Sequence, residues 1–168
     1  MAGARIDLAT DFCDLLRAFV DRRVRFLIVG AYALAVLGRP RGTGDLDVWI
    51  EPTPDNARRA FTALRDYGAP LHDLTPADLA TPGVVFQIGV PPLRIDVLTA
   101  IDGVEFEPAW RRRLRATFGD VPVTVIGRAD FLANKRATGR LKDLADAARL
   151  EPGSRRAKQR PDRRRRKT

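Results

Sequence analysis

Two aspartates, Asp45 and Asp47, lie one residue apart at the start of the apolar run DLDVWI. Because alternate side chains of a β-strand share a face, these carboxylates repel each other unless a cation lies between them. A third aspartate, Asp96, lies in another strand-like run, LRIDVL. Carboxylate ligands favour Mg²⁺ or Mn²⁺, and three converging carboxylates are typical of the metal sites that catalyse phosphoryl transfer.

A structural interpretation of the same three residues stays open. In it, Asp45 and Asp47 are solvated where the strand leaves a loop, and Asp96 is paired with an arginine. The surrounding sequence has to decide between a metal site and this simpler arrangement.

Four further residues are candidates for holding phosphate. Gly30 separates a strand-like from a helix-like run, where a phosphate could approach backbone N–H groups. Arg41 and Thr43 offer donors between that helix and the aspartates, and Lys135 offers a point charge on a later helix. Taken singly, each is equally typical of a turn glycine, a solvent-facing loop or a surface lysine.

Length and composition limit the class of protein. The 168 residues, 45% of them hydrophobic, fit one domain with a real core. Cys13 and His72 are the only residues of their types, which excludes an intrachain disulfide and catalysis built on several histidines. No run has the pattern of a membrane span or a signal peptide, so we expect a cytoplasmic protein without membrane contact.

The positive charge is concentrated at the C-terminus. Residues 155–168 hold nine basic residues and one acidic residue, which leaves +1 of the net charge of +9 for the rest of the chain. We therefore predict a domain over residues 1–150 and a basic, disordered tail over 151–168. The tail could bind nucleic acid through its phosphates, or it could be only a solvated terminus.

Hydrophobic periodicity and breaker residues predict alternating elements. Strands are expected at 25–29, 45–50, 84–90, 93–98 and 121–126. Helices are expected at 9–22, 31–37, 54–67, 76–80, 105–117, 128–137 and 140–150.

Together these residues resemble the nucleotidyltransferase superfamily, which includes DNA polymerase β-like and minimal nucleotidyltransferases. Its signature of an apolar residue, Gly, Gly or Ser, a spacer and Asp-apolar-Asp is similar to Val29-Gly30-Ala31 followed by Asp45-Leu46-Asp47. Small bacterial AbiEii-like nucleotidyltransferases are similar over about residues 24–150. Their C-terminal pattern is matched by Lys135, Gly139, Arg140, Lys142, Asp143 and Asp146.

The resemblance implies an α+β fold with a short mixed β-sheet of about five strands flanked by helices. It implies transfer of NMP from an NTP to a hydroxyl group with release of pyrophosphate. Asp45 and Asp47 would bind both metal ions, and Asp96 would bind the catalytic ion and help to deprotonate the acceptor. The implied nucleotide-binding residues are Gly30, Ala31, Arg41, Thr43 and Lys135.

One position departs from the family pattern. Ala31 stands where relatives have a glycine or a serine, so a serine hydroxyl cannot contact the phosphate. Its backbone N–H remains, and we expect weaker phosphate binding rather than loss of activity.

The acceptor is not defined by the sequence. An RNA end, a protein side chain and a small antibiotic all occur among relatives, and a role in a toxin–antitoxin or defence system with a cognate partner is implied by the AbiEii-like resemblance. The alternative is a catalytically weak protein of the same fold that binds nucleic acid or a toxin–antitoxin partner. The three aspartates argue for the enzyme, because a module that binds a phosphate polymer needs no clustered carboxylates.

Overall fold

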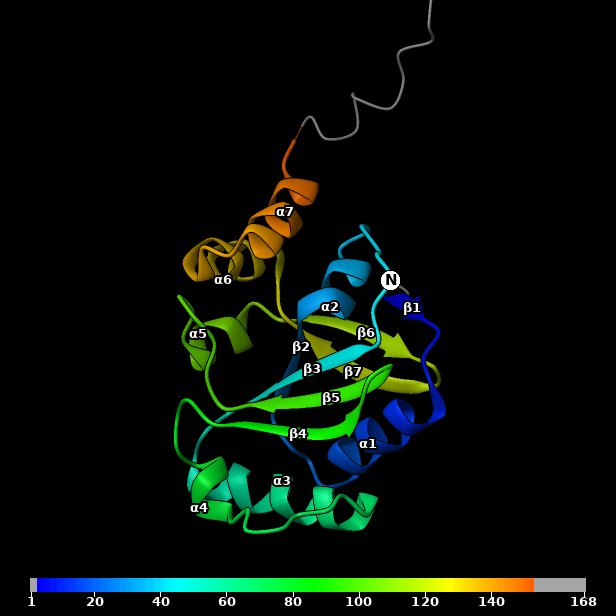
Figure 1. The fold of residues 1–168 in the computed structure, drawn as a ribbon, viewed down its shortest axis with the longest axis vertical. Helices are drawn as coiled ribbons and strands as arrows, with labels where there is room; N and C mark the ends of the chain where they lie inside the picture. Colours follow the sequence, from blue (N-terminus) through cyan, green and yellow to red (C-terminus); the bar gives the residue numbers. More distant parts are fainter. Residues whose placement is uncertain (1–2, 153–168) are drawn as a thin grey trace, which may run out of the picture.

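Residues 3–152 of the chain are described by the computed structural model, and residues 153–168 of the predicted tail (151–168) lie outside them. Within these residues one mixed sheet runs in the order β1-β6-β7-β2-β3-β5-β4 (Figure 1). Its strands are β1 (Ala4–Ile6), β2 (Phe26–Val29), β3 (Asp45–Ile50), β4 (Val85–Val90), β5 (Leu93–Leu98), β6 (Leu114–Phe118) and β7 (Val121–Val125).

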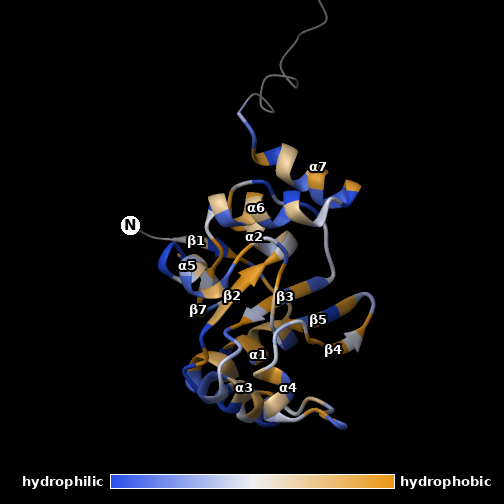
Figure 2. Ribbon diagram, turned by 90° about the vertical axis from the view of Figure 1, so that its left-hand side faces the viewer, coloured by the Kyte–Doolittle hydropathy of each residue, from blue (hydrophilic) through white to orange (hydrophobic). Residues whose placement is uncertain are grey.

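Helices cover both faces of the sheet, which gives a three-layer α+β domain. They are α1 (Thr10–Asp21), α2 (Gly30–Val36), α3 (Pro54–Tyr67), α4 (Pro76–Leu79), α5 (Phe106–Arg111), α6 (Arg128–Thr138) and α7 (Leu141–Leu150). Figures 1 and 2 both show α1, α3 and α4 on one side of the sheet and α6 and α7 on the other.

The alternation of β3 assigns its side chains to these two layers. Leu46, Val48 and Ile50 are fully buried on the α1 side, where they join the aromatic and leucine side chains of α1 in the main core. Trp49 points the other way, and its ring centroid lies 5.0 Å from that of Phe106 on α5. Asp45 and Asp47 alternate in phase with Trp49, so they lie on the α5 and α6 side of the sheet.

The register of three neighbouring strands determines which residues meet near Asp47. β2 pairs antiparallel with β3 and places Val29 opposite Asp47. β3 pairs parallel with β5 and places Asp47 opposite Asp96. The end of β2, the aspartates of β3 and the aspartate of β5 are therefore brought together by strand pairing alone.

The five predicted strands are confirmed to within one residue at each end, but the prediction for residues 105–117 is wrong in its second half. The helix ends at Arg111, and Leu114–Phe118 form β6, which pairs antiparallel with β7 across a turn at Gly119. Leu114, the first residue of β6, is 38% exposed. Sheet pairing on both sides of β6, with β7 and with the three-residue β1, outweighs the local helix propensity.

Candidate functional site

The three aspartates predicted as metal ligands lie together on one face of the sheet. Asp45 and Asp47 come from β3, and Asp96 comes from the adjacent position of β5. The Asp96 side chain is only 12% exposed, whereas that of Asp45, at the strand end, is 39% exposed. The sequence hypothesis of converging carboxylates is thus met by the strand register.

Gly30, at the junction of β2 and α2, makes room for Asp47. A Cβ atom at residue 30 would lie 2.2 Å from Oδ2 of Asp47, well inside van der Waals contact. Gly30 also has a φ of +67°, a left-handed conformation that side chains rarely adopt. The glycine of the family pattern is therefore needed here for the carboxylate as well as for the backbone turn.

Asp47 carries an uncompensated negative charge. Burial, followed by the neighbouring charges of Asp96 and Asp45, raises the pKa of Asp47 to about 6, and the cations of Lys135 and Arg94 only partly oppose this rise. Burial likewise raises the pKa of Asp96, against the lowering effect of Arg94. This group of carboxylates lacks positive charge, which is the condition that a bound cation would relieve.

Arg94 is the cation nearest to these carboxylates, and the contact is loose. It lies two residues before Asp96 on β5, and its NH2 group donates to Oδ2 of Asp96 at 3.3 Å and to Oδ2 of Asp45 at 3.4 Å. Its Nε lies 3.2 Å from Oδ1 of Asp96 without hydrogen-bond alignment. Charge-assisted pairs are ordinarily about 2.7–2.9 Å. The structural interpretation, with Asp96 paired to an arginine, is therefore met in part.

The carboxylates fit a hard divalent cation chemically. Oxygen ligands suit Mg²⁺ and Mn²⁺, and Oδ1 of Asp96 is a buried oxygen without a hydrogen-bond partner among the described residues. In residues 3–152, no three His, Cys, Asp or Glu side chains are already arranged to hold a metal ion. Arg94 contacts both Asp45 and Asp96, so a cation that bridges them has to displace its guanidinium group.

Two of the predicted phosphate-binding residues are held by α7. Arg41 donates to Asp146 through Nε at 2.9 Å and NH2 at 3.1 Å. Nζ of Lys135 lies 3.0 Å from Oδ1 of Asp143 and 3.5 Å from Oδ2 of Asp146. Both cations are therefore linked to Asp146, and the charge of Lys135 also reaches Asp47.

The remaining predicted residues, Thr43 and Ala31, surround the entrance to β3 and the start of α2. The Thr43 hydroxyl accepts a hydrogen bond from the backbone N–H of Asp45 at 3.0 Å, so it fixes the first residue of the strand. Ala31 is buried next to Gly30. Gly44 is also required, because a Cβ atom there would lie 1.6 Å from the carbonyl oxygen of Pro92.

Sequence reasoning missed Arg94 and gave no role to Asp143 or Asp146. Arg94 could have been found, because residues two apart on a strand share a face and Asp96 was already placed there. The partners of Asp143 and Asp146 come from α6 and from the loop before β3, and no local pattern indicates such long-range contacts.

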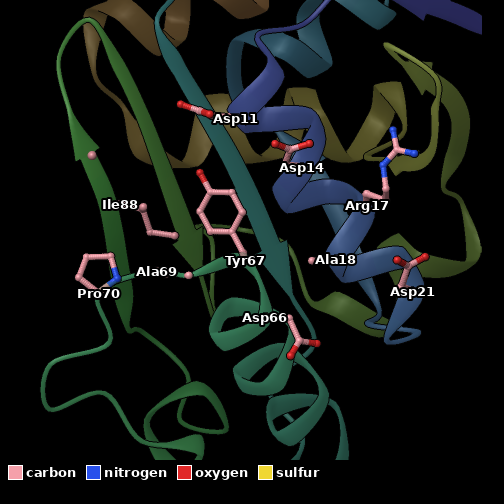
Figure 3. Close-up of a pocket in the computed structure, with 12 residues that line it drawn as sticks. Asp11, Asp14, Arg17, Ala18, Asp21, Asp66, Tyr67, Ala69, Pro70 and Ile88 are labelled. Atoms are coloured by element: carbon pink, nitrogen blue, oxygen red, sulfur yellow. The ribbon is translucent and has the colours of Figure 1, made fainter.

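An open groove of about 780 Å³ lies away from these carboxylates, between α1, the end of α3 and β4 (Figure 3). Ile88 lines it, whereas the adjacent Gln87 is in register with Asp96, so the groove and the carboxylates lie on opposite faces of the sheet. Acidic side chains dominate its polar lining: Asp11, Asp14, Asp21 and Asp66. Their charge would repel a nucleoside triphosphate, so the groove does not compete with the carboxylate face as a nucleotide site.

Two solved structures have the same fold as this chain. The crystal structure of the lincosamide antibiotic adenylyltransferase LnuA with lincomycin bound matches with a TM-score of 0.56 at 12% identity, over 88% of this chain and 98% of that one. A Thermotoga maritima protein with a provisional nucleotidyltransferase assignment matches with a TM-score of 0.51 at 12% identity, over 85% and 92%. No protein-family model and no curated sequence gives a match.

The chain therefore has a nucleotidyltransferase fold, as the resemblance of its motifs implied. At 12% identity the likeness defines the fold alone, and the chemistry rests on the residues described above. In the part of the chain that the structure describes, no helix is long and apolar enough to cross a membrane.

Proposed function

We propose that this protein is a nucleotidyltransferase that depends on Mg²⁺ or Mn²⁺. The oxygen of an acceptor hydroxyl group attacks the α-phosphorus of an NTP, the bond to the β-phosphate breaks, and pyrophosphate leaves. The acceptor oxygen gives up its proton and becomes esterified with NMP.

The observation that carries this proposal is the deficit of positive charge around Asp47. The buried carboxylate of Asp96 and the half-buried one of Asp47, in register on adjacent strands, are costly to the fold unless they serve a ligand. A divalent cation neutralises them, and the same cation draws in the phosphates of an NTP. The charges of Asp96 and Asp45 add to the effect of burial on the pKa of Asp47, and the charge of Asp45 adds to it for Asp96.

Each side chain then has a definite task. Asp45, Asp47 and Asp96 would hold the metal, which would neutralise charge on the phosphates and lower the pKa of the acceptor hydroxyl. Asp96, with its raised pKa, is suited to take the acceptor proton, because a carboxylate above its ordinary pKa is a stronger base. Lys135 and Arg41 would bind the β- and γ-phosphates, and the backbone at Gly30 and Ala31 would lie along them.

The acceptor is the open part of the proposal. LnuA acts on lincosamides, so a small hydroxyl-bearing antibiotic is one class to test, beside RNA ends and protein side chains. ATP is the first nucleotide to test because that relative is an adenylyltransferase.

The test is transfer of label from each of the four α-³²P NTPs, with Mg²⁺ or Mn²⁺, to total RNA, to lysate proteins and to a lincosamide. Asp47→Asn should abolish both transfer and pyrophosphate release. Asp55→Asn is the matched control, since Asp55 is an exposed carboxylate that pairs with Arg58 on the same helix. Absence of transfer to every acceptor class by the unaltered protein would refute the proposal.

The contact of Arg94 with Asp96 keeps a second candidate function in view, a binding protein with little catalysis. In that case the carboxylates are neutralised by Arg94, and nucleic acid binds elsewhere, with the tail 155–168 as the first candidate. Salt-sensitive RNA binding that is lost on deletion of 155–168, together with no label transfer, would favour it. Co-purification with a small partner would extend the same candidate to a toxin–antitoxin pair.

A further inference from the structure

A second group of charges lies between α6, α7 and the loop that precedes β3. It comprises Arg41, Lys135, Arg140, Asp143 and Asp146. Asp143, Asp146 and Lys135 are all buried. Buried ions reduce the stability of the fold unless each has a well-placed partner, so the relative positions of these side chains are closely defined.

Asp146 joins two segments that are distant in the sequence. Its two oxygens accept hydrogen bonds from two nitrogens of Arg41, and Oδ2 also lies 3.5 Å from Nζ of Lys135. A bidentate pair fixes the plane of the guanidinium group as well as its position. Arg41 lies in a loop, outside any helix or strand. Its side chain is therefore oriented by the contact with Asp146 on α7.

Asp143 fixes the second cation. Its carboxylate accepts hydrogen bonds from Lys135 at 3.0 Å, from Thr138 at 2.7 Å and from Arg140 at 2.7 Å. Burial alone would raise the pKa of Asp143, but these hydrogen bonds and the charge of Lys135 hold it at about 2. The carboxylate is therefore ionised at any working pH.

Each cation has more N–H donors than these contacts use among the described residues. An arginine has five N–H donors, and Asp146 engages two nitrogens of Arg41. An ammonium group has three N–H donors, and that of Lys135 lies close to two carboxylates of α7, those of Asp143 and Asp146. The charge of Lys135 also lowers the pKa of Asp47 on β3. The unengaged donors can serve an anion bound next to the strand carboxylates.

We propose that Asp146, supported by Asp143, is a positioning residue that holds Arg41 and Lys135 as a pair for the phosphates of the NTP. It acts through these cations and does not touch the substrate. The inference rests on the proposed function for its ligand, a metal-bound triphosphate, and gives α7 a part in the site.

The fold supplies a matched control for this role. Arg112 donates to Asp130 at 2.9 and 2.7 Å, the same bidentate arrangement on a carboxylate that is also buried. Asp130 lies five residues before Lys135 on α6, so the two point about 140° apart around the helix. Asp130→Asn therefore removes an ion pair of the same bidentate geometry, though with a more exposed arginine, without touching the proposed phosphate donors.

The experiment measures binding of inorganic tripolyphosphate with Mg²⁺ by calorimetry, together with KM and kcat for NTP in the transfer assay and the melting temperature. Asp146→Asn should weaken tripolyphosphate binding and raise KM roughly 10- to 100-fold, with a smaller change in kcat. Asp130→Asn should change binding less than twofold, at a similar loss in melting temperature. Asp146→Glu should restore part of the affinity, and Asp146→Asn should add little to Arg41→Met.

The outcomes separate this inference from the proposed function. If Asp146→Asn binds tripolyphosphate like Asp130→Asn, or its effect adds fully to that of Arg41→Met, the positioning role is refuted even though transfer continues. If the unaltered protein transfers NMP without measurable tripolyphosphate binding, the inference fails and the proposed function stands. If it neither binds tripolyphosphate nor transfers label, both fail.

Discussion

The carboxylates of the strands and those of α7 lie on the same side of the sheet but differ in their surroundings. Asp47 on β3 has two carboxylate neighbours and a pKa raised to about 6. Asp143 on α7 has hydrogen bonds from a lysine, a threonine and an arginine and a pKa of about 2. The first group has only the loose contacts of Arg94, at 3.2–3.4 Å, whereas the second has closely placed cations from the chain itself.

The difference indicates what each group is built to do. Charge that the fold leaves uncompensated reduces its stability, so it is expected where a ligand completes the site. Charge that the fold neutralises fully is expected where a side chain must stay in place. On this basis we propose that the strand carboxylates bind a cation from solution and that those of α7 orient cations that belong to the protein.

The largest expected effect comes from neutralising Asp47. Asp47→Asn should lower the transfer rate about a thousandfold or more, because it removes a proposed metal ligand. It should leave the free energy of unfolding unchanged or raise it by roughly 1–2 kcal/mol at pH 7.5, because a repulsive charge is lost. Transfer assays and urea unfolding of the same preparation test both statements, and a clear loss of stability would contradict the comparison.

Asp143→Asn should have the opposite profile. Loss of this buried carboxylate leaves Lys135 with only the longer contact to Asp146 and removes the partner of Arg140, at a cost of about 2–4 kcal/mol in the free energy of unfolding. Urea unfolding at pH 7.5 measures this, with Asp55→Asn as the exposed control. A loss below about 0.5 kcal/mol would show that the α7 carboxylates are not neutralised as tightly as the contacts indicate.

The two carboxylates should also respond to pH with opposite signs. In the folded protein Asp47 stays protonated at pH values above its ordinary pKa of 3.8. Its ionisation therefore lowers the free energy of unfolding as the pH rises from about 4 to 6. Asp143 has a lowered pKa, so it contributes stability above about pH 4 that is lost as the pH falls towards 2. The stability gained by Asp47→Asn should therefore grow between pH 4 and 6.5, by on the order of 2 kcal/mol.

The smallest effect is expected from the metal itself. Addition of 10 mM Mg²⁺ or Mn²⁺ should raise the melting temperature by about 2–4 °C, equivalent to about 1 kcal/mol. Asp47→Asn should abolish this shift and Asp143→Asn should retain it. Arg94→Met should enlarge it, since Arg94 then no longer competes for Asp45 and Asp96. A shift that is the same in all four proteins would place the metal elsewhere.

Much of this arrangement could be predicted from the sequence because it depends on local patterns. The two-residue period of β3 assigned Asp45 and Asp47 to one face, and the five strands that were predicted are all present. Gly139 was predicted to separate the last two helices, and it does so with a φ of +67°.

The errors and omissions depend on pairing between distant segments. Residues 114–118 form a strand because β1 and β7 flank them, and β1 has only three residues, too few for a periodic signal. Asp146 meets Arg41 across 105 positions of the sequence, and no spacing rule indicates such a contact. The register that sets Asp96 opposite Asp47 is likewise a property of the assembled sheet.

Gly30 has a consequence for how related sequences are interpreted. The space that Asp47 occupies exists because residue 30 lacks a side chain, so the two positions work as one unit although only one bears a functional group. A homologue with alanine at this position could retain every aspartate and still have a displaced carboxylate. An inactive protein of this fold would then be recognised by alanine at the position of Gly30, although it retains all three aspartates.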